Sequence, residues 1–390
     1  MIERRVSLSL PHRVFFTEGV FDAGQPLLRG LLCPLNEKQR SRRVLVVVEP
    51  AVAAGQELLL EKIQAWFAAQ DGLLTLVSPP LVIEGGEPCK NDWRLVEKLW
   101  AAINDGGIDR HSYVIAIGGG ALLDLVGFAA ATAHRGIRLI RMPTTTLSQG
   151  DGGVGVKNGV NHFQKKNWVG TFAVPFAVIN DFRFLESLPS ADLRDGIIEA
   201  VKVSLIRDEA FFQELEAKAE ALGRLEKPVL HWVIERSADL HTAHICTGGD
   251  PFEFGSARPL DFGHWIAHKL EQLSNFRIGH GRAVAIGMAA DLVYASLAGM
   301  LEEGQRDRIL SLLEQIGFRL WDDDLLRADA SGKLEVLRGL EEFREHLGGD
   351  LCITLVTAPG QAVEVHEMDA ALVEQSLAWL HARESAPALN

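Results

Sequence analysis

Apolar and polar residues alternate in blocks along the first half of the chain. Short runs rich in valine, leucine and isoleucine recur at residues 43–50, 73–80, 112–120 and 137–146. Longer stretches with apolar residues at helical spacing, such as 55–70 and 91–105, lie between them. Buried strands that alternate with helices of this length are typical of a parallel sheet with helices on both faces. The pattern predicts such a sheet for this half.

The pattern changes after about Asp181. From there the apolar spacing is that of long amphipathic helices, beginning at residues 188–206, and strand-like runs become rare. We therefore predict a Rossmann-like α/β domain over residues 1–181 and a mostly α-helical domain over residues 182–390.

Composition narrows the class of protein. Of the 390 residues, 47% are hydrophobic and 23% are charged, as in folded soluble proteins. The net charge of -13 argues against a general binder of nucleic acid or anionic membranes, because both partners would be repelled. The four cysteines form no CxxC pair, the N-terminus lacks the apolar core of a signal peptide, and the longest apolar runs have only strand length. We expect a cytoplasmic protein with a small-molecule partner.

A glycine-rich turn stands where a predicted strand meets a helix. In IGGGALLD (117–124) three glycines let a ligand approach the backbone, and the helix N-terminus favours a phosphate. The turn lacks the GxGxxG spacing of the usual dinucleotide fold, so a tight turn without a ligand is the alternative. Glu49 at a strand end, and Glu87 with Lys90, are placed to contact a ribose, although each alone suits a solvated loop. Together with the glycines they favour a dinucleotide.

The segment 141–167 places polar side chains among five glycines. A surface linker could have this composition, but a linker rarely joins two apolar strand-like runs. Lysines and asparagines on a glycine-rich frame can hold a phosphorylated or polyhydroxylated anion. The polar residues are Thr144, Thr145, Asp151, Lys157, Asn161, His162, Lys166 and Asn167.

A pair of histidines opens a predicted helix in DFGHWIAHKLE (261–271). His264 and His268 are one helical turn apart, which suits a metal site, an acid–base pair, or two histidines that only cap and pack. The spacing alone leaves all three open.

A set of short motifs, taken in order, resembles the dehydroquinate synthase, or sugar phosphate cyclase, family. The resemblance implies an N-terminal nucleotide-binding domain, a helical C-terminal domain, bound NAD and one divalent metal, Zn2+ or Co2+. The motifs are GGG-x3-D (118–124), HRG (134–136), PTT (143–145), DGGVGVK (151–157), KKN (165–167), Glu199 with Lys202, GH-x3-H (263–268) and HGRAVAIGM (280–288).

The resemblance also assigns roles to residues. The metal ligands would be Glu199, His264 and His280, and His268 would face the substrate as an acid–base or phosphate-contacting group. The NAD contacts would be Glu49, Glu87, Lys90, Gly118, Gly119, Gly120, Asp124, Thr144, Thr145, Lys157 and Lys166. The substrate or catalytic contacts would be Arg135, Asp151, Lys157, Asn167, Lys202, His244, Arg258 and Asp261.

The reaction implied by the resemblance makes a carbocycle from a sugar phosphate. NAD removes hydride from an alcohol while the metal polarises its oxygen, and the new ketone acidifies a C–H bond so that phosphate leaves. The hydride is then returned, and an intramolecular aldol step closes the ring. A homodimer is expected on the same basis.

Several positions depart from the family pattern. His244 stands where the family usually has a lysine, Asp261 replaces an asparagine, and Arg344 and His346 replace a late lysine. These changes remove cations and add a carboxylate, which suits a hydroxyl better than the carboxylate of the usual heptulosonate substrate. Leu123 and Val156 occupy glycine positions of the family and mark divergence. The pattern RPLDFGHW…HK (258–269) with FREHLGG (343–349) is most similar to the EboD-type branch of cyclase homologues.

Two other functions compete with the cyclase. A metal-dependent alcohol or glycerol dehydrogenase would share the architecture and the glycine turn, but a neutral polyol needs no phosphate-holding cluster such as Lys157, Lys166 and Asn167. A catalytically inactive NAD-binding scaffold is suggested by His244 and opposed by the intact set of Glu199, His264 and His280.

Overall fold

The computed structural model describes residues 1–4, 8–33, 41–70, 72–163, 165–247, 261–346 and 351–385, with the side chain of residue 346 outside this set. The chain forms two compact units. The first comprises Met1–Pro189 and His241–Phe252, and the second comprises Ser190–Leu240 and Glu253–Asn390. The domain boundary expected near Asp181 stays a prediction; the last strand of the first unit ends at that residue.

A parallel sheet of seven strands forms the centre of the first unit. The strand order is β1-β9-β6-β5-β2-β3, and β4 also pairs with β2. All these pairings are parallel, so the predicted parallel sheet is confirmed. The strands are β1 (Val14–Thr17), β2 (Arg42–Val48), β3 (Leu74–Leu76), β4 (Leu81–Val82), β5 (Tyr113–Gly118), β6 (Arg138–Pro143) and β9 (Ala177–Asp181).

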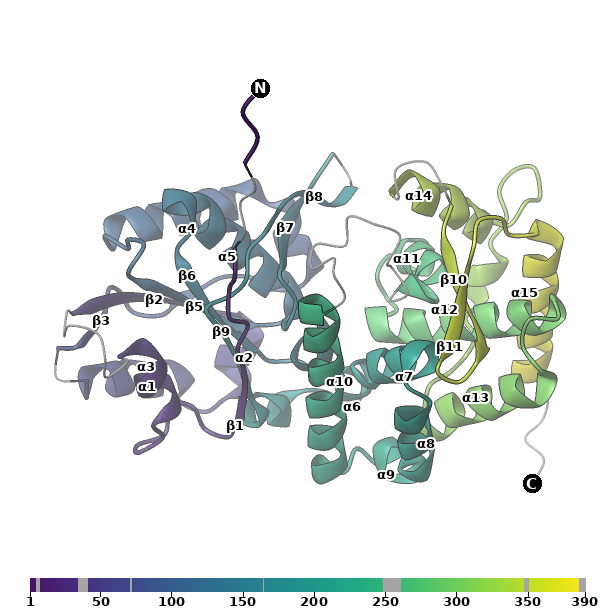
Figure 1. Ribbon diagram of the computed structural model, residues 1–390, viewed down its shortest axis with the longest axis horizontal. Helices are drawn as coiled ribbons and strands as arrows, with labels where there is room; N and C mark the ends of the chain where they lie inside the picture. The colour runs from purple at the N-terminus through teal and green to yellow at the C-terminus, as the bar shows by residue number, and fades with distance from the viewer. Residues whose placement is uncertain are drawn as a thin grey trace. The chain divides into compact units, whose positions relative to one another are not determined.

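Helices cover both faces of this sheet, as the alternation of elements predicts (Figure 1). Successive residues of a strand point to opposite faces, so Val44, Val46 and Val48 of β2 pack in one core cluster while Leu45 and Val47 pack in the other. The first cluster includes residues of α1 (Leu27–Leu32) and α3 (Leu59–Ala68), and the second includes residues of α4 (Trp93–Asp105) and α5 (Gly120–Thr132).

Two of the predicted helices are interrupted. The stretch 55–70 is not one helix, because α2 (Pro50–Gly55) ends before Leu58, whose positive φ of 54° breaks the helical path. The stretch 188–206 divides into α6 (Ser190–Asp195) and α7 (Ile197–Arg207), with Gly196 between them.

The polar glycine-rich segment forms a turn and a hairpin. After β6, a π-helical turn η3 (Ser148–Gly152) leads into β7 (Lys157–His162), which pairs antiparallel with β8 (Lys165–Phe172). A short 3-10 helix η1 (Glu87–Asn91) precedes α4, and another, η2 (Ala133–Arg135), follows α5. A further 3-10 helix, η4 (Phe182–Ser187), follows β9.

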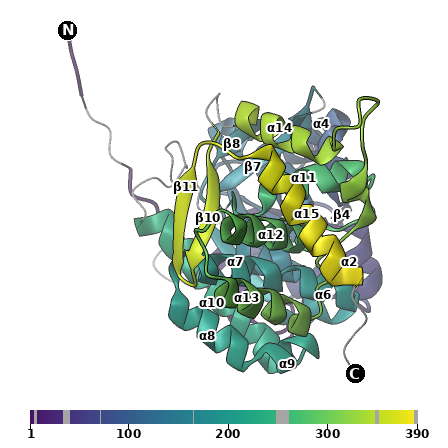
Figure 2. The ribbon, with the colours of Figure 1, turned by 90° about the vertical axis from the view of Figure 1, so that its right-hand side faces the viewer.

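The second unit is mostly helical, as predicted. Its helix α12 (His280–Leu297) is buried along most of its length and contacts α7, α11, α13, α15 and β10, which surround it in Figure 2. The other elements are α8 (Glu209–Ala217), α9 (Ala219–Gly223), α10 (Lys227–Thr247, whose residues from His241 belong to the first unit), α11 (His264–Leu273), α13 (Glu303–Ile316), η6 (Asp323–Leu326), η7 (Glu335–Leu337), α14 (Arg338–His346), the hairpin β10 (Ile353–Ala358) and β11 (Gln361–Val365), and α15 (Ala370–Ser385). Among the described residues, no helix combines the length and the hydropathy needed to cross a membrane.

Candidate active site

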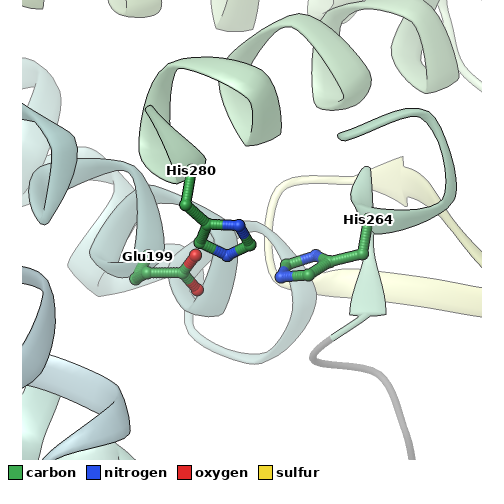
Figure 3. A group of neighbouring side chains, drawn as sticks. All are labelled: Glu199, His264 and His280. Carbon is green, nitrogen blue, oxygen red and sulfur yellow. The ribbon is translucent and has the colours of Figure 1, made fainter. Parts of the chain in front are cut away.

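Three helix starts of the second unit bring a carboxylate and two imidazoles together. Glu199 lies in the first turn of α7, His264 is the first residue of α11, and His280 is the first residue of α12. One potential ligand atom from each residue lies within 4.8 Å of the others. Figure 3 shows the carboxylate and the two rings turned toward a common centre. The three residues belong to three different helices and are distant in the sequence, so the tertiary fold brings them together.

In each histidine of this cluster, one ring nitrogen faces a hydrogen-bond acceptor and the other is suited to a metal ion. His264 Nδ1 lies 3.0 Å from the carbonyl oxygen of Phe262, and His280 Nδ1 lies 3.2 Å from Glu271 Oε2. Both oxygens are acceptors, so each Nδ1 carries the proton and each Nε2 keeps its lone pair. Metal-binding histidines are usually fixed by such a bond from the second ring nitrogen. Both Nε2 atoms are therefore suited to a metal ion.

The charge on the cluster also fits a cation. Both carboxylate oxygens of Glu199 are buried and accept no hydrogen bond within the described part of the chain, although Lys202 Nζ makes an ion pair with Oε2. Burial lowers the pKa of His264 well below its ordinary value, and the nearby charges of Lys202, His280 and His268 act in the same direction. A neutral imidazole is the form that binds metal.

Close packing of α11 against α12 places His264. Gly263, at φ 77°, precedes the helix, and a Cβ atom there would lie 2.6 Å from the backbone nitrogen of Met288. Asp291 of α12 accepts hydrogen bonds from Gly263 N at 3.1 Å and from Trp265 Nε1 at 2.9 Å. These two bonds fix the residues on either side of His264. Burial raises the pKa of Asp291 to about 7, against the effect of both donors.

The third histidine of the sequence motif joins the same cluster. The His268 ring centroid lies 5.5 Å from that of His264 and 5.9 Å from that of His280. Ligand atoms of His268, Glu271 and His280 form a second group within 4.8 Å. Because Glu271 already accepts from His280 Nδ1, the Nε2 atoms of His264 and His280 and the carboxylate of Glu199 form the more suitable cation site.

In the first unit, the three glycines lie between β5 and α5 as predicted. Gly118 ends the strand, and Gly119 N donates to Glu49 Oε2 at 2.7 Å. The Glu49 carboxylate lies so close to this turn that a Cβ atom on Gly118 would be 2.8 Å from Oε2, and one on Gly85 would be 2.1 Å from Oε1. Glycine is required at both positions for this approach. The turn therefore joins an open helix N-terminus to an acidic side chain.

A buried lysine connects the glycine turn with the polar hairpin. Lys90 Nζ lies 3.1 Å from Asp124 Oδ2 of α5 and also donates to Asn167 Oδ1 of β8. Glu87 Oε2 is 3.8 Å from the same nitrogen, and Asn161 donates to Glu87 Oε1 at 2.9 Å. Burial raises the pKa of Asp124, while Lys90 and Arg141 oppose this. Residues predicted for cofactor and substrate contact thus form one polar network.

Comparison with known proteins identifies one enzyme family. Residues 80–195 match the family model described as 3-dehydroquinate synthase N-terminal, and residues 196–337 match that described as 3-dehydroquinate synthase C-terminal. A 2-epi-5-epi-valiolone synthase of Streptomyces glaucescens is 33% identical over 92% of this chain and 87% of its own length. The chain belongs to the dehydroquinate synthase family of sugar phosphate cyclases. A 3-dehydroquinate synthase of Nitrosospira multiformis is 35% identical over 86% of this chain and 88% of its own length.

Solved structures agree with this membership. A 2-epi-5-epi-valiolone synthase from Streptomyces hygroscopicus subsp. jinggangensis, with NAD+ and Zn2+ bound, has a TM-score of 0.81 at 26% identity and covers 98% of this cyclase and 100% of its own chain. A probable glycerol dehydrogenase from Sinorhizobium meliloti has a TM-score of 0.60 at 15% identity, covering 97% and 98% of the two chains. The second likeness shows a shared fold alone. The predicted family, fold and lyase-type enzyme class are confirmed.

The remaining predicted site residues of the cyclase lie on several elements of the first unit. Thr144 N donates to Gly118 O at 3.1 Å, and Thr145 Oγ1 lies 2.8 Å from Ser148 Oγ. Lys157 begins β7, and Lys166 lies in β8. Arg135 lies in η2, at the far end of α5 from the glycine turn, a separation of roughly 20 Å for a helix of 13 residues. Arg135 thus lies away from that turn, and its expected contact with substrate stays a prediction.

Two of the predicted positions lie wholly or partly outside the described residues. Arg258 lies outside the described residues, as does the side chain of residue 346. Asp261 directly precedes Phe262, whose carbonyl oxygen orients His264, and Arg344 pairs with Glu341. On α10, His241 lies within ion-pair distance of Asp151, one helical turn before the predicted His244.

Sequence reasoning missed Arg141, which organises the polar segment of the cyclase. This fully buried side chain donates to the carbonyl oxygens of Gly153 at 3.2 Å, Gly155 at 3.0 Å and Lys157 at 2.7 Å, and to Asn158 Oδ1 at 2.7 Å. The signal was available, because an arginine in the middle of the apolar run 137–143 has to be paired when that run is buried. The guanidinium fixes the carbonyl groups of the loop that carries Asp151 and Lys157.

We expect Arg141→Met to destabilise the protein strongly. The substitution leaves several buried carbonyl groups without a donor, which should lower the free energy of unfolding by about 3–5 kcal/mol. Urea unfolding followed by circular dichroism measures the loss. The control is Arg43→Met, because Arg43 is exposed and makes its bond to Gly107 O at the surface. Equal effects of the two substitutions would contradict the organising role.

We expect Asp291 to give the stability a dependence on pH. Its folded pKa of about 7 lies above the value of an unfolded aspartate, so its favourable contribution is complete at low pH and is lost as the pH rises toward 7. The unfolding free energy of wild type minus that of Asp291→Asn should fall by roughly 1 kcal/mol per pH unit within this window. Histidines that titrate in this range contribute equally to both proteins, so their effect cancels in the difference. A flat difference between pH 4 and pH 8, like that expected for the exposed control Glu374→Gln, would refute the assignment.

Proposed function

We propose that the chain is an NAD- and zinc-dependent cyclase that converts a heptulose phosphate without a carboxylate into a carbocycle, with release of phosphate. The observation that carries the proposal is the cluster of Glu199, His264 and His280, whose ligand atoms lie within 4.8 Å of one another. Membership of the sugar phosphate cyclase family supplies the reaction class.

The residues of the cluster fit a divalent metal. One carboxylate and two Nε2 atoms are a common set of ligands for catalytic zinc, which keeps a further position for substrate. The buried Glu199 oxygens, which accept no hydrogen bond among the described residues, have the character of ligand atoms. The valiolone synthase at TM-score 0.81 was solved with Zn2+, which supports zinc here. Co2+ is the alternative, since the same donor types bind it.

The first unit fits NAD. Gly118, Gly119 and Gly120 form an open helix start beside the Glu49 carboxylate, a combination suited to a pyrophosphate and a ribose. The remaining proposed contacts are Glu87, Lys90, Asp124, Thr144, Thr145, Lys157 and Lys166. NAD+ in the valiolone synthase structure supports this assignment.

The chain's own side chains have distinct tasks in this proposal. When bound, NAD supplies a reversible acceptor for hydride, and the metal supplies a Lewis acid. Phe262 O and Glu271 hold the two imidazoles in one orientation, so that the donor set is formed before substrate arrives. Lys157 and Asn167, on the hairpin, would hold the phosphate that leaves, as the charge on it increases. Lys202, paired with Glu199, would contact a substrate hydroxyl.

The side chains near the proposed metal site bear on the charge of the substrate. Asp261 adds a carboxylate three residues before His264, and Arg344 is an exposed residue paired with Glu341. A second negative group on the substrate near Asp261 would be repelled by this carboxylate. The relatedness to valiolone synthases, as well as to 3-dehydroquinate synthases, agrees with a substrate that departs from the carboxylated one.

We also propose that the enzyme is a cytoplasmic homodimer without a nucleic-acid or membrane partner. The family resemblance supports the dimer, and the net charge of -13 supports the absence of polyanionic partners. Sedimentation velocity and a DNA-binding assay at low salt test these points.

We expect metal binding to depend on the ligands and on the residue that orients one of them. Glu199→Gln and His264→Ala should retain no zinc after dialysis, whereas Glu271→Gln should weaken zinc binding by about 10–100-fold, because His280 loses its acceptor. Metal analysis and competition with a chromogenic chelator measure this. The exposed Glu374→Gln is the control, and circular dichroism checks folding. Unchanged zinc content in Glu199→Gln and His264→Ala would refute the site.

We expect the zinc- and NAD-loaded protein to release phosphate from a neutral heptulose phosphate. A carboxylated heptulosonate phosphate should react at least about 100-fold more slowly, since an unpaired buried carboxylate costs a few kcal/mol. Phosphate release and the carbocyclic product are scored together, with nicotinamide absorbance recorded in parallel. Phosphate without accumulating NADH supports the cyclase. Steady NADH accumulation without phosphate would instead establish a dehydrogenase and overturn the proposal.

A further inference from the structure

Helix α10 brings a histidine to the aspartate of the glycine-rich turn. His241 Nδ1 lies 2.8 Å from Asp151 Oδ1, and the two side chains are 11% and 27% exposed. The approach lacks the straight N–H···O geometry of a hydrogen bond, so the contact is made within ion-pair distance at an angle to the ring. The family resemblance pointed to His244 on this helix, whose role stays a prediction, and the structure places His241 beside Asp151.

The second ring nitrogen of His241 lies over a glycine. A Cβ atom on Gly155 would lie 3.6 Å from His241 Nε2, so a larger residue would bring its side chain against this nitrogen. Glycine at this position leaves the face of the loop below Nε2 uncovered by a side chain. The two nitrogens of this imidazole therefore have different neighbours: Nδ1 faces a carboxylate, and Nε2 faces the backbone of Gly155.

The turn under this pair is held firmly from other sides. Arg141 donates to the carbonyl oxygens of Gly153 and Gly155 from β6, and Val154 N donates to Asp151 O at 2.9 Å. His12, in the segment before β1, places Nε2 at 2.7 Å from Val154 O. Among the described residues, Asp151 of η3 lies at ion-pair distance from His241, and His12 is near enough to interact electrostatically with both His241 and Arg141. Fixed backbone and fixed partners are what a site for proton transfer requires.

We propose that Asp151 and His241 form a proton-transfer pair for a hydroxyl group of the substrate. The Asp151 carboxylate faces Nδ1 at ion-pair distance, and Nε2 takes the proton. The O–H bond breaks, its electron pair stays on oxygen, and an N–H bond forms on Nε2; the reverse step returns the proton. A carboxylate that orients an imidazole stabilises the imidazolium that results. The inference rests on the proposed function, because the hydroxyl belongs to the proposed polyol phosphate.

The first test separates catalysis from binding. His241→Gln keeps the size and polarity of the side chain but cannot exchange the proton, so kcat for phosphate release should fall by about 10²–10⁴-fold with little change in KM. Asp151→Asn should also lower kcat. The double variant should lose little more than His241→Gln alone, because the two residues act as a unit. Asp239→Asn, exposed on the same helix, is the control and should keep wild-type turnover.

Two kinetic results would overturn the pair. One is a His241→Gln enzyme whose kcat stays within threefold of wild type, and the other is a loss confined to KM. Fully additive losses in the double variant would show that the two residues act separately, which also overturns it.

A second test needs no turnover. Nitrogen-15 spectra of the imidazoles in the zinc- and NAD-loaded protein, assigned with His241→Gln, report the tautomer and titration of His241. Asp151→Asn should change both for His241, while Asp239→Asn should change neither. Resonances of His241 that are insensitive to Asp151→Asn would refute the pair. If wild type releases no phosphate but this coupling is seen, the proposed function fails while the pair is retained.

Discussion

A charged group that leaves water has to find partners inside the protein, and this constraint organises both units. Arg141, fully buried in the sheet of the first unit, is satisfied by carbonyl groups of the loop that carries Asp151 and Lys157. Because that loop is rich in glycine and would otherwise be pliant, the guanidinium gives it one conformation. In the second unit the buried Glu199 carboxylate is paired with Lys202, but its oxygens accept no hydrogen bond among the described residues. A buried charge with a full set of hydrogen bonds holds the surrounding backbone in place, whereas a buried carboxylate without them is suited to a ligand.

The same constraint distinguishes the histidines that are suited to bind metal. An imidazole within a protein has two nitrogens, and the partner of one fixes the chemistry of the other. Phe262 O and Glu271 engage the Nδ1 atoms of His264 and His280, which leaves two Nε2 lone pairs for a cation. In the first unit Asp151 faces Nδ1 of His241, and Nε2 lies over Gly155. The first arrangement therefore suits a metal and the second suits a proton.

Much of the fold follows from the sequence pattern. Apolar runs locate β2, β3, β5 and β6, because strands buried on both faces leave few polar positions. The break at Leu58 was not foreseen, since a leucine with positive φ leaves no local signal. The β7–β8 hairpin was missed as well, because its lysines, asparagines and glycines read as a loop.

The candidate site is less accessible to sequence reasoning. The spacing of His264 and His268 left a metal, an acid–base pair and simple packing open, and Glu199 and His280 were added only by family resemblance. Asp291, Glu271 and His241 were missed because each lies within a helix and its partner belongs to another element, 26, 9 and 90 residues away. What distinguishes them is burial beside a specific donor or acceptor, a property of the fold rather than of the local pattern.

The charges of the chain bear on its substrate in a consistent way. A histidine faced by an aspartate carries together with it a net charge of zero or minus one, whereas a lysine on the same helix would bring a full positive charge. Asp261 adds a further negative charge, and Arg344 is balanced by Glu341. Lys157 and Lys166 are the cations proposed to hold the phosphate. These differences in charge support the proposed substrate, a polyol with a single anionic group.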